Sequence, residues 1–141
     1  MAPNMDIALD ELLAAAKAVQ ANAHAPYSRF RVGAAVRTAS GRIFSGCNVE
    51  NAAYPQGSCA EAGAISAMVA AGEREIVAVL TMCDGEAIGT CCGGCRQRLR
   101  EFASGNTPIY AAGPDGVRAT FTLDALLPHS FGPEHLNEFQ H

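Results

Sequence analysis

The sequence lacks the features that mark a membrane protein, a secreted protein or a nucleic-acid-binding protein. It has no apolar run of about 18 or more residues, so no segment is predicted to cross a bilayer. The first ten residues carry two acidic side chains and no basic one, unlike the start of a secretory signal. Basic residues are also in deficit, because 10 Lys and Arg face 14 Asp and Glu, which gives a net charge of −4. Binding through nucleic-acid phosphates is therefore disfavoured, and we expect a cytoplasmic protein with a small-molecule substrate and neither a nucleic-acid nor a membrane partner.

Aromatic residues are scarce as well, at 6% of the chain against 49% for all hydrophobic residues. Alanine and valine supply much of the hydrophobic fraction, which predicts a core of small side chains. A chain of 141 residues can bury such a core without disulfide bonds, and we expect a single domain spanning residues 1–141. In a reducing compartment, the six cysteines favour metal binding or burial over a disulfide framework.

The hydrophobic pattern predicts an α/β fold. Helices and strands alternate along the chain, and a glycine-containing turn joins the first two strands into an antiparallel hairpin. This order predicts a mixed sheet with helices on both faces, which is a three-layer α/β domain. The expected helices are 6–22, 58–71 with Ser58 as the N-cap, 93–103 and a short helical tail, and the expected strands are 30–38, 42–48, 75–82, 108–112 and 117–122.

Two cysteine motifs carry the chemistry. Cys-Ala-Glu at 59–61 is followed by Cys-Gly-Gly-Cys at 92–95, and both motifs lie at expected helix starts. The amide groups and the dipole at a helix N-terminus lower thiol pKa values and so favour metal binding. Three thiolate ligands leave tetrahedral Zn²⁺ one open position for water, and Glu61 is then free to move protons.

Other interpretations of these motifs stay open. Ser58 and Glu61 have the spacing of a capping box, in which Glu61 would have a structural role. A Cys-x-x-Cys pair also occurs in redox dithiols and in structural zinc sites. A binding protein with a structural four-cysteine zinc would take its fourth ligand from Cys47, Cys83 or Cys91.

A wider pattern resembles the short, three-cysteine cytidine deaminase family. The similarity covers 25–28, 30–35, 47–54, 59–61, 92–97 and 126–128 with Phe131, and so nearly the whole chain. The resemblance implies a cytidine deaminase-like α-β-α fold with about five strands. It also implies zinc-dependent hydrolytic deamination of cytidine and 2′-deoxycytidine in pyrimidine salvage, by a homotetramer whose subunits share active sites.

The resemblance also implies a role for each matching residue. The ribose hydroxyls would be held by an amide and a carboxylate, which suit a sugar diol. Phenylalanines would line the pyrimidine pocket, one of them from a neighbouring subunit. The implied residues are Cys59, Cys92 and Cys95 on Zn²⁺, Glu61 for proton transfer, Asn48 and Glu50 on ribose, Phe30 and Phe131 around the base, and the Ala60 backbone at the base edge.

The chain departs from the family pattern at two places, which together include three residues. Ala62 and Gly63 replace an Arg-Thr pair whose arginine would donate to the zinc thiolates, and Cys91 replaces a proline. We expect Arg96 and the helix ends to offset the thiolate charge instead. A pocket widened at positions 62 and 63 would favour another aminopyrimidine nucleoside or a nucleoside-like antibiotic as substrate.

Overall fold

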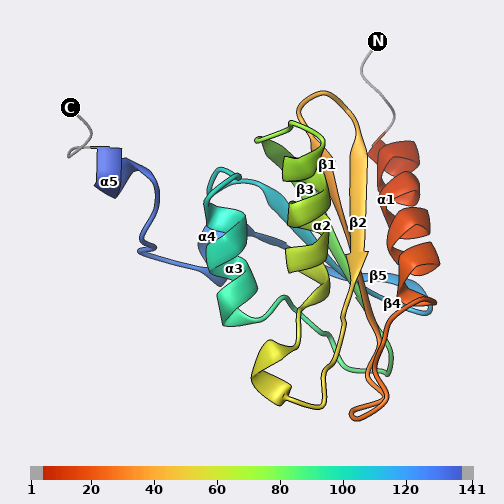
Figure 1. Ribbon diagram of the computed structural model, residues 1–141. Helices are drawn as coiled ribbons and strands as arrows, with labels where there is room; N and C mark the ends of the chain where they lie inside the picture. Colours follow the sequence, from red (N-terminus) through yellow and green to blue (C-terminus); the bar gives the residue numbers. More distant parts are fainter. Residues whose placement is uncertain (1–4, 138–141) are drawn as a thin grey trace.

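The fold is built on a mixed five-stranded sheet in the order β2-β1-β3-β4-β5 (Figure 1). The computed structural model describes residues 5–137. Strands β2, β3 and β4 run in one direction, and β1 and β5 run in the other. The elements are α1 Met5–Gln20, β1 Val32–Thr38, β2 Ile43–Cys47, the 3₁₀ turn η1 Tyr54–Gln56, α2 Ala60–Ala70, β3 Ile76–Cys83, α3 Gly93–Arg100, β4 Pro108–Gly113, β5 Gly116–Thr122, α4 Leu123–Leu126 and α5 Glu134–Asn137.

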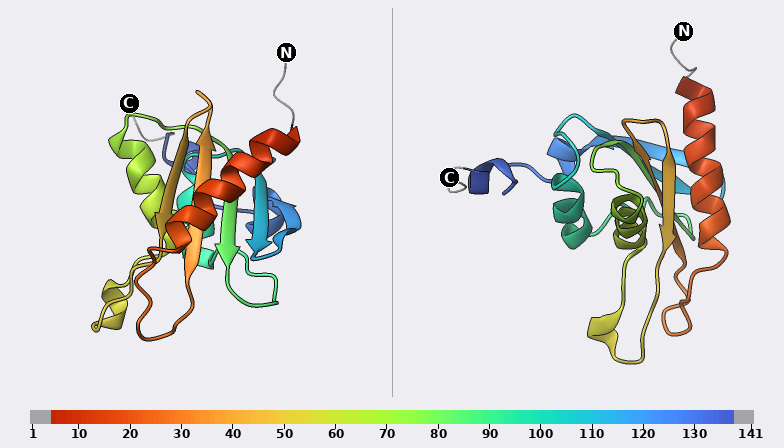
Figure 2. Two further views of the ribbon diagram at one scale, coloured as in Figure 1. Left: turned by 90° about the vertical axis from the view of Figure 1, so that its right-hand side faces the viewer. Right: turned by 45° about the horizontal axis from the view of Figure 1, so that its top comes forward.

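Helices cover both faces of this sheet, which confirms the predicted three layers. Helix α1 lies on one face, and α2 and α3 lie on the other (Figures 1 and 2). Leu12 and Ala16 of α1 pack against Ala35 and Leu80 of the sheet. The opposite face carries a larger cluster, in which Met68 of α2 joins residues of α3 and of the central strands. Buried alanines recur in both clusters, as the composition predicts.

The topology brings the starts of α2 and α3 to one edge of the sheet. Helix α2 follows β2 and α3 follows β3, and these two strands run in the same direction. Both helices therefore begin at the carboxyl end of a strand, the edge at which α/β folds commonly place their sites. Gly46 lets α2 approach the sheet closely, because an added Cβ would lie 2.4 Å from the backbone nitrogen of Ala64.

Several predicted boundaries are wrong by a few residues. Cys59, rather than Ser58, is the N-cap of α2, and α3 ends at Arg100 instead of near residue 103. The first strand begins at Val32, because the preceding residues form the loop that leads from α1. Boundaries depend on tertiary contacts that the local pattern does not contain.

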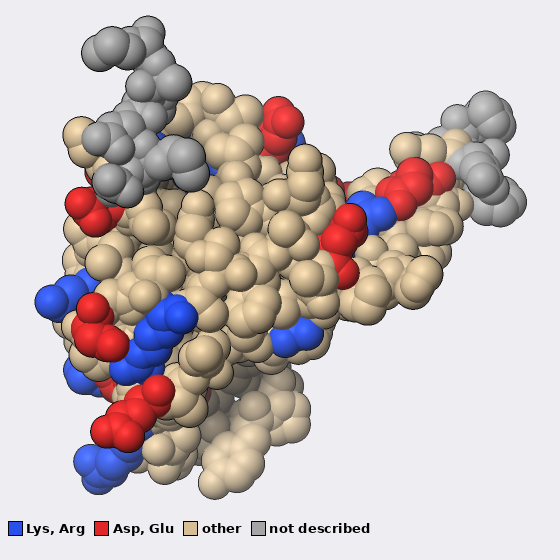
Figure 3. Space-filling view, turned by 180° about the vertical axis from the view of Figure 1, so that it is seen from behind, with Lys and Arg blue, Asp and Glu red and all other residues tan. Residues whose placement is uncertain are grey.

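Basic and acidic side chains are interspersed on the face seen in Figure 3, without a continuous basic area. None of the helices in residues 5–137 combines the length and the hydropathy needed to traverse a bilayer.

Candidate active site

Three thiols meet between the starts of α2 and α3. Cys59 is the N-cap of α2, Cys92 is the N-cap of α3, and Cys95 lies in the first turn of α3. Their sulfur atoms all lie within 4.8 Å of one another, and the Sγ atoms of Cys59 and Cys92 are 3.7 Å apart. A tetrahedral zinc with Zn–S bonds of about 2.3 Å places its sulfurs roughly 3.8 Å apart. The three thiols therefore fit Zn²⁺.

The remaining cysteines do not complete a four-thiolate site. Within residues 5–137, the metal-binding group contains three side chains, and no fourth His, Cys, Asp or Glu joins it. Cys91 is buried in the core cluster against α2 and α3. Burial, with a contribution from the charge of Glu61, raises the pKa of Cys83 and that of Cys91 to about 11 each. This arrangement leaves one zinc position open and argues against the structural four-cysteine alternative.

The surroundings of the three thiols disfavour the ionised form of two of them. Burial raises the pKa of Cys59 and of Cys95, and the negative charge of Glu61 raises both further. Burial also disfavours the thiolate of Cys92, but hydrogen bonds from Cys95 outweigh it and lower the pKa of Cys92. A divalent cation bound by the three sulfurs would counteract these effects, because coordination to a metal favours the thiolate form.

Glu61 is a buried carboxyl group beside the thiols. It is the second residue of α2 and only 3% exposed. Burial raises the pKa of Glu61, while a hydrogen bond with Cys95 and the charge of Arg98 act in the opposite direction. The predicted alternative of a capping box is wrong, because α2 has no side-chain cap and the Ser58 hydroxyl lies against the carbonyl oxygen of Cys59.

Cys59, Cys92 and Glu61 line a pocket of about 370 Å³, and Cys95 is buried behind it. Four of the five expected substrate-binding residues line it, namely Phe30, Asn48, Glu50 and Ala60. The volume lies within the range typical of small-molecule sites. Sequence reasoning missed several other residues of the pocket wall, namely Val32, Val49, Thr81 and Thr90.

Asn48 and Glu50 are held in place by the loop that precedes β1. The amide of Asn48 accepts a hydrogen bond from the Val32 nitrogen at 2.9 Å and donates one to the Phe30 carbonyl oxygen at 2.8 Å. Glu50 accepts hydrogen bonds from the backbone nitrogens of Tyr27 and Ser28 and from the Ser28 hydroxyl. The Ser28 hydrogen bonds are the main cause that lowers the pKa of Glu50. Both side chains are thus oriented, and Glu50 is kept ionised.

Phe131 is not brought to the pocket of its own chain. It is 56% exposed and lies in the C-terminal segment that extends away from the sheet (Figures 1 and 2). Its ring stacks on His135 with centroids 5.1 Å apart, and its carbonyl oxygen accepts a hydrogen bond from Gln97. Phe30, by contrast, lines the pocket and remains 46% exposed.

Arg96, which we expected to donate to the thiolates and offset their charge, makes its hydrogen bonds elsewhere. Its guanidinium donates to the carbonyl oxygens of Cys91 and Leu126 and to the Thr90 hydroxyl. Arg98, which sequence reasoning missed, is the arginine that reaches a thiol, with its Nη1 3.5 Å from the Cys95 Sγ. Its spacing of three residues after Cys95 was the available signal, because such pairs share a helix face.

The departures at positions 62 and 63 do not widen the pocket. Neither Ala62 nor Gly63 is among the residues that line it. Gly63 instead faces β2, where an added Cβ would lie 3.4 Å from the Gly46 Cα. The structural reason for expecting a bulkier substrate is therefore removed.

An α/β sandwich that gathers three thiols and a buried carboxyl group at a pocket is the arrangement of the zinc-dependent deaminases. The family model for the cytidine and deoxycytidylate deaminase zinc-binding region matches residues 8–111. The chain therefore belongs to the cytidine and deoxycytidylate deaminase family, and its three-thiol cluster fits the zinc of that family.

Individual relatives agree with this assignment over most of their length. A cytidine deaminase of Sporosarcina psychrophila is 38% identical over 94% of this chain and 96% of its own. One from Halalkalibacterium halodurans is 35% identical over 92% of this chain and 100% of its own. The crystal structure of a cytidine deaminase from Burkholderia pseudomallei superposes with a TM-score of 0.80, at 38% identity, over 86% of this chain and 98% of that one.

Proposed function

We propose that this protein is a single-domain enzyme that hydrolyses cytidine and 2′-deoxycytidine to uridine and 2′-deoxyuridine, with release of ammonia, in pyrimidine salvage. The observation that carries the proposal is the cluster of three thiols beside a buried carboxyl group at the pocket of about 370 Å³. A cytoplasmic location is part of the proposal, and the net charge of −4 supports a nucleoside rather than a nucleic-acid substrate.

Cys59, Cys92 and Cys95 would hold the zinc, and Glu61 would move the protons. When bound, zinc supplies the Lewis acid that makes water a nucleophile near neutral pH. Glu61 takes a proton from the attacking water and delivers it to ring nitrogen N3 as the new C–O bond forms at C4. Glu61 would then pass the remaining proton of the new C4 hydroxyl group to N4, so that the C4–N4 bond breaks, the C4 carbonyl forms and ammonia leaves. A single carboxyl group can act first as base and then as acid, and the burial of Glu61, which raises its pKa above the ordinary value, favours the acid step.

The other pocket residues would position the nucleoside. Asn48 and Glu50 offer an amide and an ionised carboxylate to the ribose hydroxyls, and their hydrogen bonds to the loop before β1 fix them in advance. Phe30 would pack against the pyrimidine, and the backbone at Ala60 would read the base edge. These assignments rest on position in the pocket and on the family pattern.

Loss of cytidine absorbance on conversion to uridine tests the activity directly. Zinc-loaded protein should turn cytidine over, a chelator should abolish turnover, and added zinc should restore it. Protein that binds one zinc per chain without turnover would contradict the proposal.

A substrate panel then defines the specificity. Cytidine and 2′-deoxycytidine should be good substrates, and cytosine should be poor because it lacks the sugar. The nucleoside phosphates should be poor because, among residues 5–137, no basic side chain lines the pocket. A Glu50→Gln variant should raise KM for cytidine more than for cytosine. An equal rise for both would remove Glu50 from the sugar site.

We further infer that the enzyme is a homotetramer with shared active sites, in which Phe131 enters a neighbouring subunit's pocket. The exposure of Phe131 and the direction of the C-terminal segment support this arrangement. Tyr27, Val49 and Tyr54 are also large, exposed and close to the pocket, as expected for an interface.

Light scattering on a sizing column measures the assembly, and subunit mixing tests the sharing. A Phe131→Ala variant and a Glu61→Gln variant should each be nearly inactive. After the two variants are mixed and exchange subunits, a Phe131→Ala subunit, which keeps Glu61, receives Phe131 from a Glu61→Gln neighbour. Part of the activity should then return. An active monomer, or mixing without any gain between exchanged subunits, would refute shared sites.

A further inference from the structure

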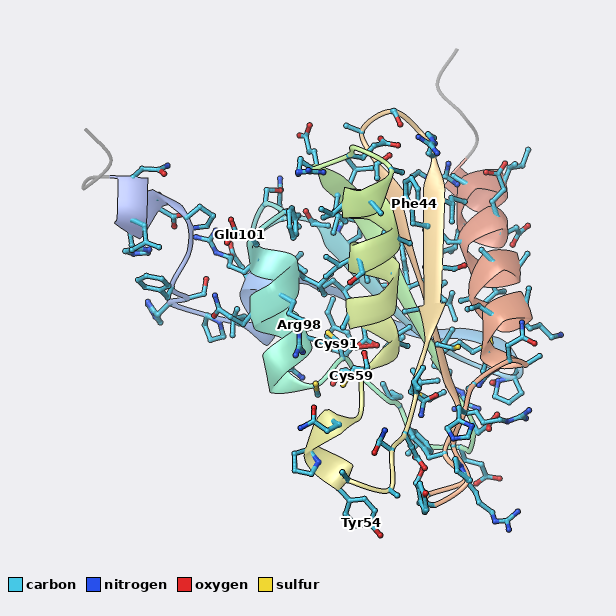
Figure 4. The ribbon with its side chains drawn as sticks, viewed as in Figure 1. Phe44, Tyr54, Cys59, Cys91, Arg98 and Glu101 are labelled. Atoms are coloured by element: carbon cyan, nitrogen blue, oxygen red, sulfur yellow. The ribbon has the colours of Figure 1, made fainter. Side chains whose placement is uncertain are left out.

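Arg98 is an exposed arginine whose guanidinium contacts the sulfur of Cys95. Cys95 occupies the first turn of α3 and Arg98 lies one turn later. Helical side chains lean toward the N-terminus, so a long side chain three residues after Cys95 folds back over it. The guanidinium Nη1 of Arg98 consequently donates to the Sγ of Cys95 at 3.5 Å. In Figure 4, Arg98 lies on the side of α3 that faces α2, close to Cys59 and Cys91.

The glycine at position 94 leaves room for the guanidinium of Arg98. A Cβ added at Gly94 would lie 3.3 Å from the Arg98 Nη1, so a side chain at position 94 would press on the guanidinium. Helix α2 has no counterpart, because Ala62 stands three residues after Cys59. Among residues 5–137, Arg98 is the arginine with a hydrogen bond to a thiol of the cluster, and Arg96 is bonded elsewhere.

We propose that Arg98 is a positioning residue of the zinc site, and that its charge offsets the net negative charge of zinc bound by three thiolates. This inference rests on the proposed function, because it concerns the same zinc site. Zinc binding releases the thiol protons and converts a neutral cluster into one with net negative charge. A guanidinium hydrogen-bonded to one sulfur stabilises that bound state, since charge-assisted hydrogen bonds are strong.

The expected effect is on zinc affinity. Removing a side chain that supports a metal ligand typically costs 10- to 100-fold in affinity. Arg98→Gln keeps a neutral amide donor on a shorter side chain and loses the charge, and it should weaken zinc binding by about that factor. Arg98→Lys keeps the charge and should recover most of the affinity. Because Arg98 is exposed, neither change should alter the fold.

The experiment measures zinc dissociation constants by competition with a chromophoric chelator, without substrate. Arg100→Gln is the matched control, because Arg100 lies on the same helix but bonds to Ser130 and Glu134. The control should bind zinc like the wild type. The thiolate-to-metal absorption band of the cobalt-substituted protein should shift in Arg98→Gln and stay unchanged in the control.

Three outcomes would overturn the role of Arg98. These are wild-type zinc affinity in Arg98→Gln, an equal loss in the Arg100→Gln control, and a loss in Arg98→Lys as large as that in Arg98→Gln. Because the measurement uses zinc or cobalt alone, it is independent of whether cytidine is the substrate. Normal zinc affinity in Arg98→Gln with full cytidine turnover would defeat this inference and leave the proposed function intact.

Discussion

Replacing Glu61 with glutamine separates the proposed catalytic role of this side chain from a structural one. Glutamine has nearly the same shape as a protonated glutamic acid but cannot carry a proton between water and the base. Glu50, the other carboxylate that lines the pocket among the described residues, is a poor substitute, because hydrogen bonds from Ser28 lower its pKa and so make it a weaker base. Glu61→Gln should therefore lose the full contribution of general acid–base catalysis, which is about 10²- to 10⁴-fold in rate. This loss corresponds to roughly 3–5 kcal/mol of transition-state stabilisation.

The same substitution should not destabilise the fold. Burial raises the pKa of Glu61 above its ordinary value, so ionisation costs more in the folded than in the unfolded protein. This cost is absent below the unfolded pKa and is complete above the folded pKa. A neutral glutamine avoids it, and the Tm of the metal-free variant near neutral pH should equal or exceed that of the wild type.

The assay combines cytidine turnover, zinc content and thermal unfolding. Glu101→Gln is the control, because it removes one carboxylate at the end of α3, away from the pocket (Figure 4). We expect full zinc, an intact fold and very low turnover in Glu61→Gln, with all three unchanged in the control. A variant that keeps more than about a tenth of the wild-type kcat/KM would refute the proton-transfer role. A large fall in Tm would instead return Glu61 to a structural role.

Three further predictions concern the metal site, the packing of α2 and an acid-sensitive hydrogen bond. Cys92→Ser should abolish stable zinc binding, whereas Cys91→Ser should retain one zinc per chain by metal analysis; equal loss would mean that the site is not the three-thiol one. Gly46→Ala should lower the free energy of unfolding by about 1–3 kcal/mol, because the new Cβ would lie 2.4 Å from the backbone of α2. Gly93→Ala, which meets no atom within 4 Å, is its control in urea unfolding, and similar losses would refute the close-packing argument. Hydrogen bonds from the hydroxyl groups of Ser40 and Thr38 lower the pKa of Glu73. The ionised carboxylate therefore stabilises the fold above its ordinary pKa, and this contribution is lost as the pH falls through the lowered pKa of the folded protein. Urea midpoints of Glu73→Gln should accordingly fall less steeply with acid than those of the wild type, and parallel curves would contradict the linkage.

The cluster of three thiols could be predicted from the spacing of cysteines at the expected helix starts. Cys59, Cys92 and Cys95 lie at helix starts that the capping and glycine pattern predicts within about two residues. Those starts follow strands that run in the same direction, so the thiols meet at one edge of the sheet. The five strands and the layered order were likewise predictable, because alternation and apolar runs are properties of neighbouring residues.

The arginines show where such reasoning stops. Arg96 and Arg98 have the same charge and both lie within three residues of Cys95, and sequence reasoning selected Arg96. In the folded chain, the Leu126 carbonyl oxygen from α4 accepts from Arg96, which is a contact between residues 30 positions apart. Arg98 remains available to Cys95 because it lies one turn further along the same helix.

The sequence by itself determined the class of the chain, the three cysteines that fit zinc and the order of the helices and strands, because these depend on residue types at short and regular spacings. Only the tertiary structure decided that Glu61 is buried without capping α2 and that Cys91 belongs to the core. It also decided that Phe131 lies outside its own pocket, and that Arg98 rather than Arg96 contacts a thiol. The physical reason is that burial and hydrogen-bond partners depend on segments far apart in the chain, which only the packing of α2, α3 and the C-terminal segment brings together or keeps apart.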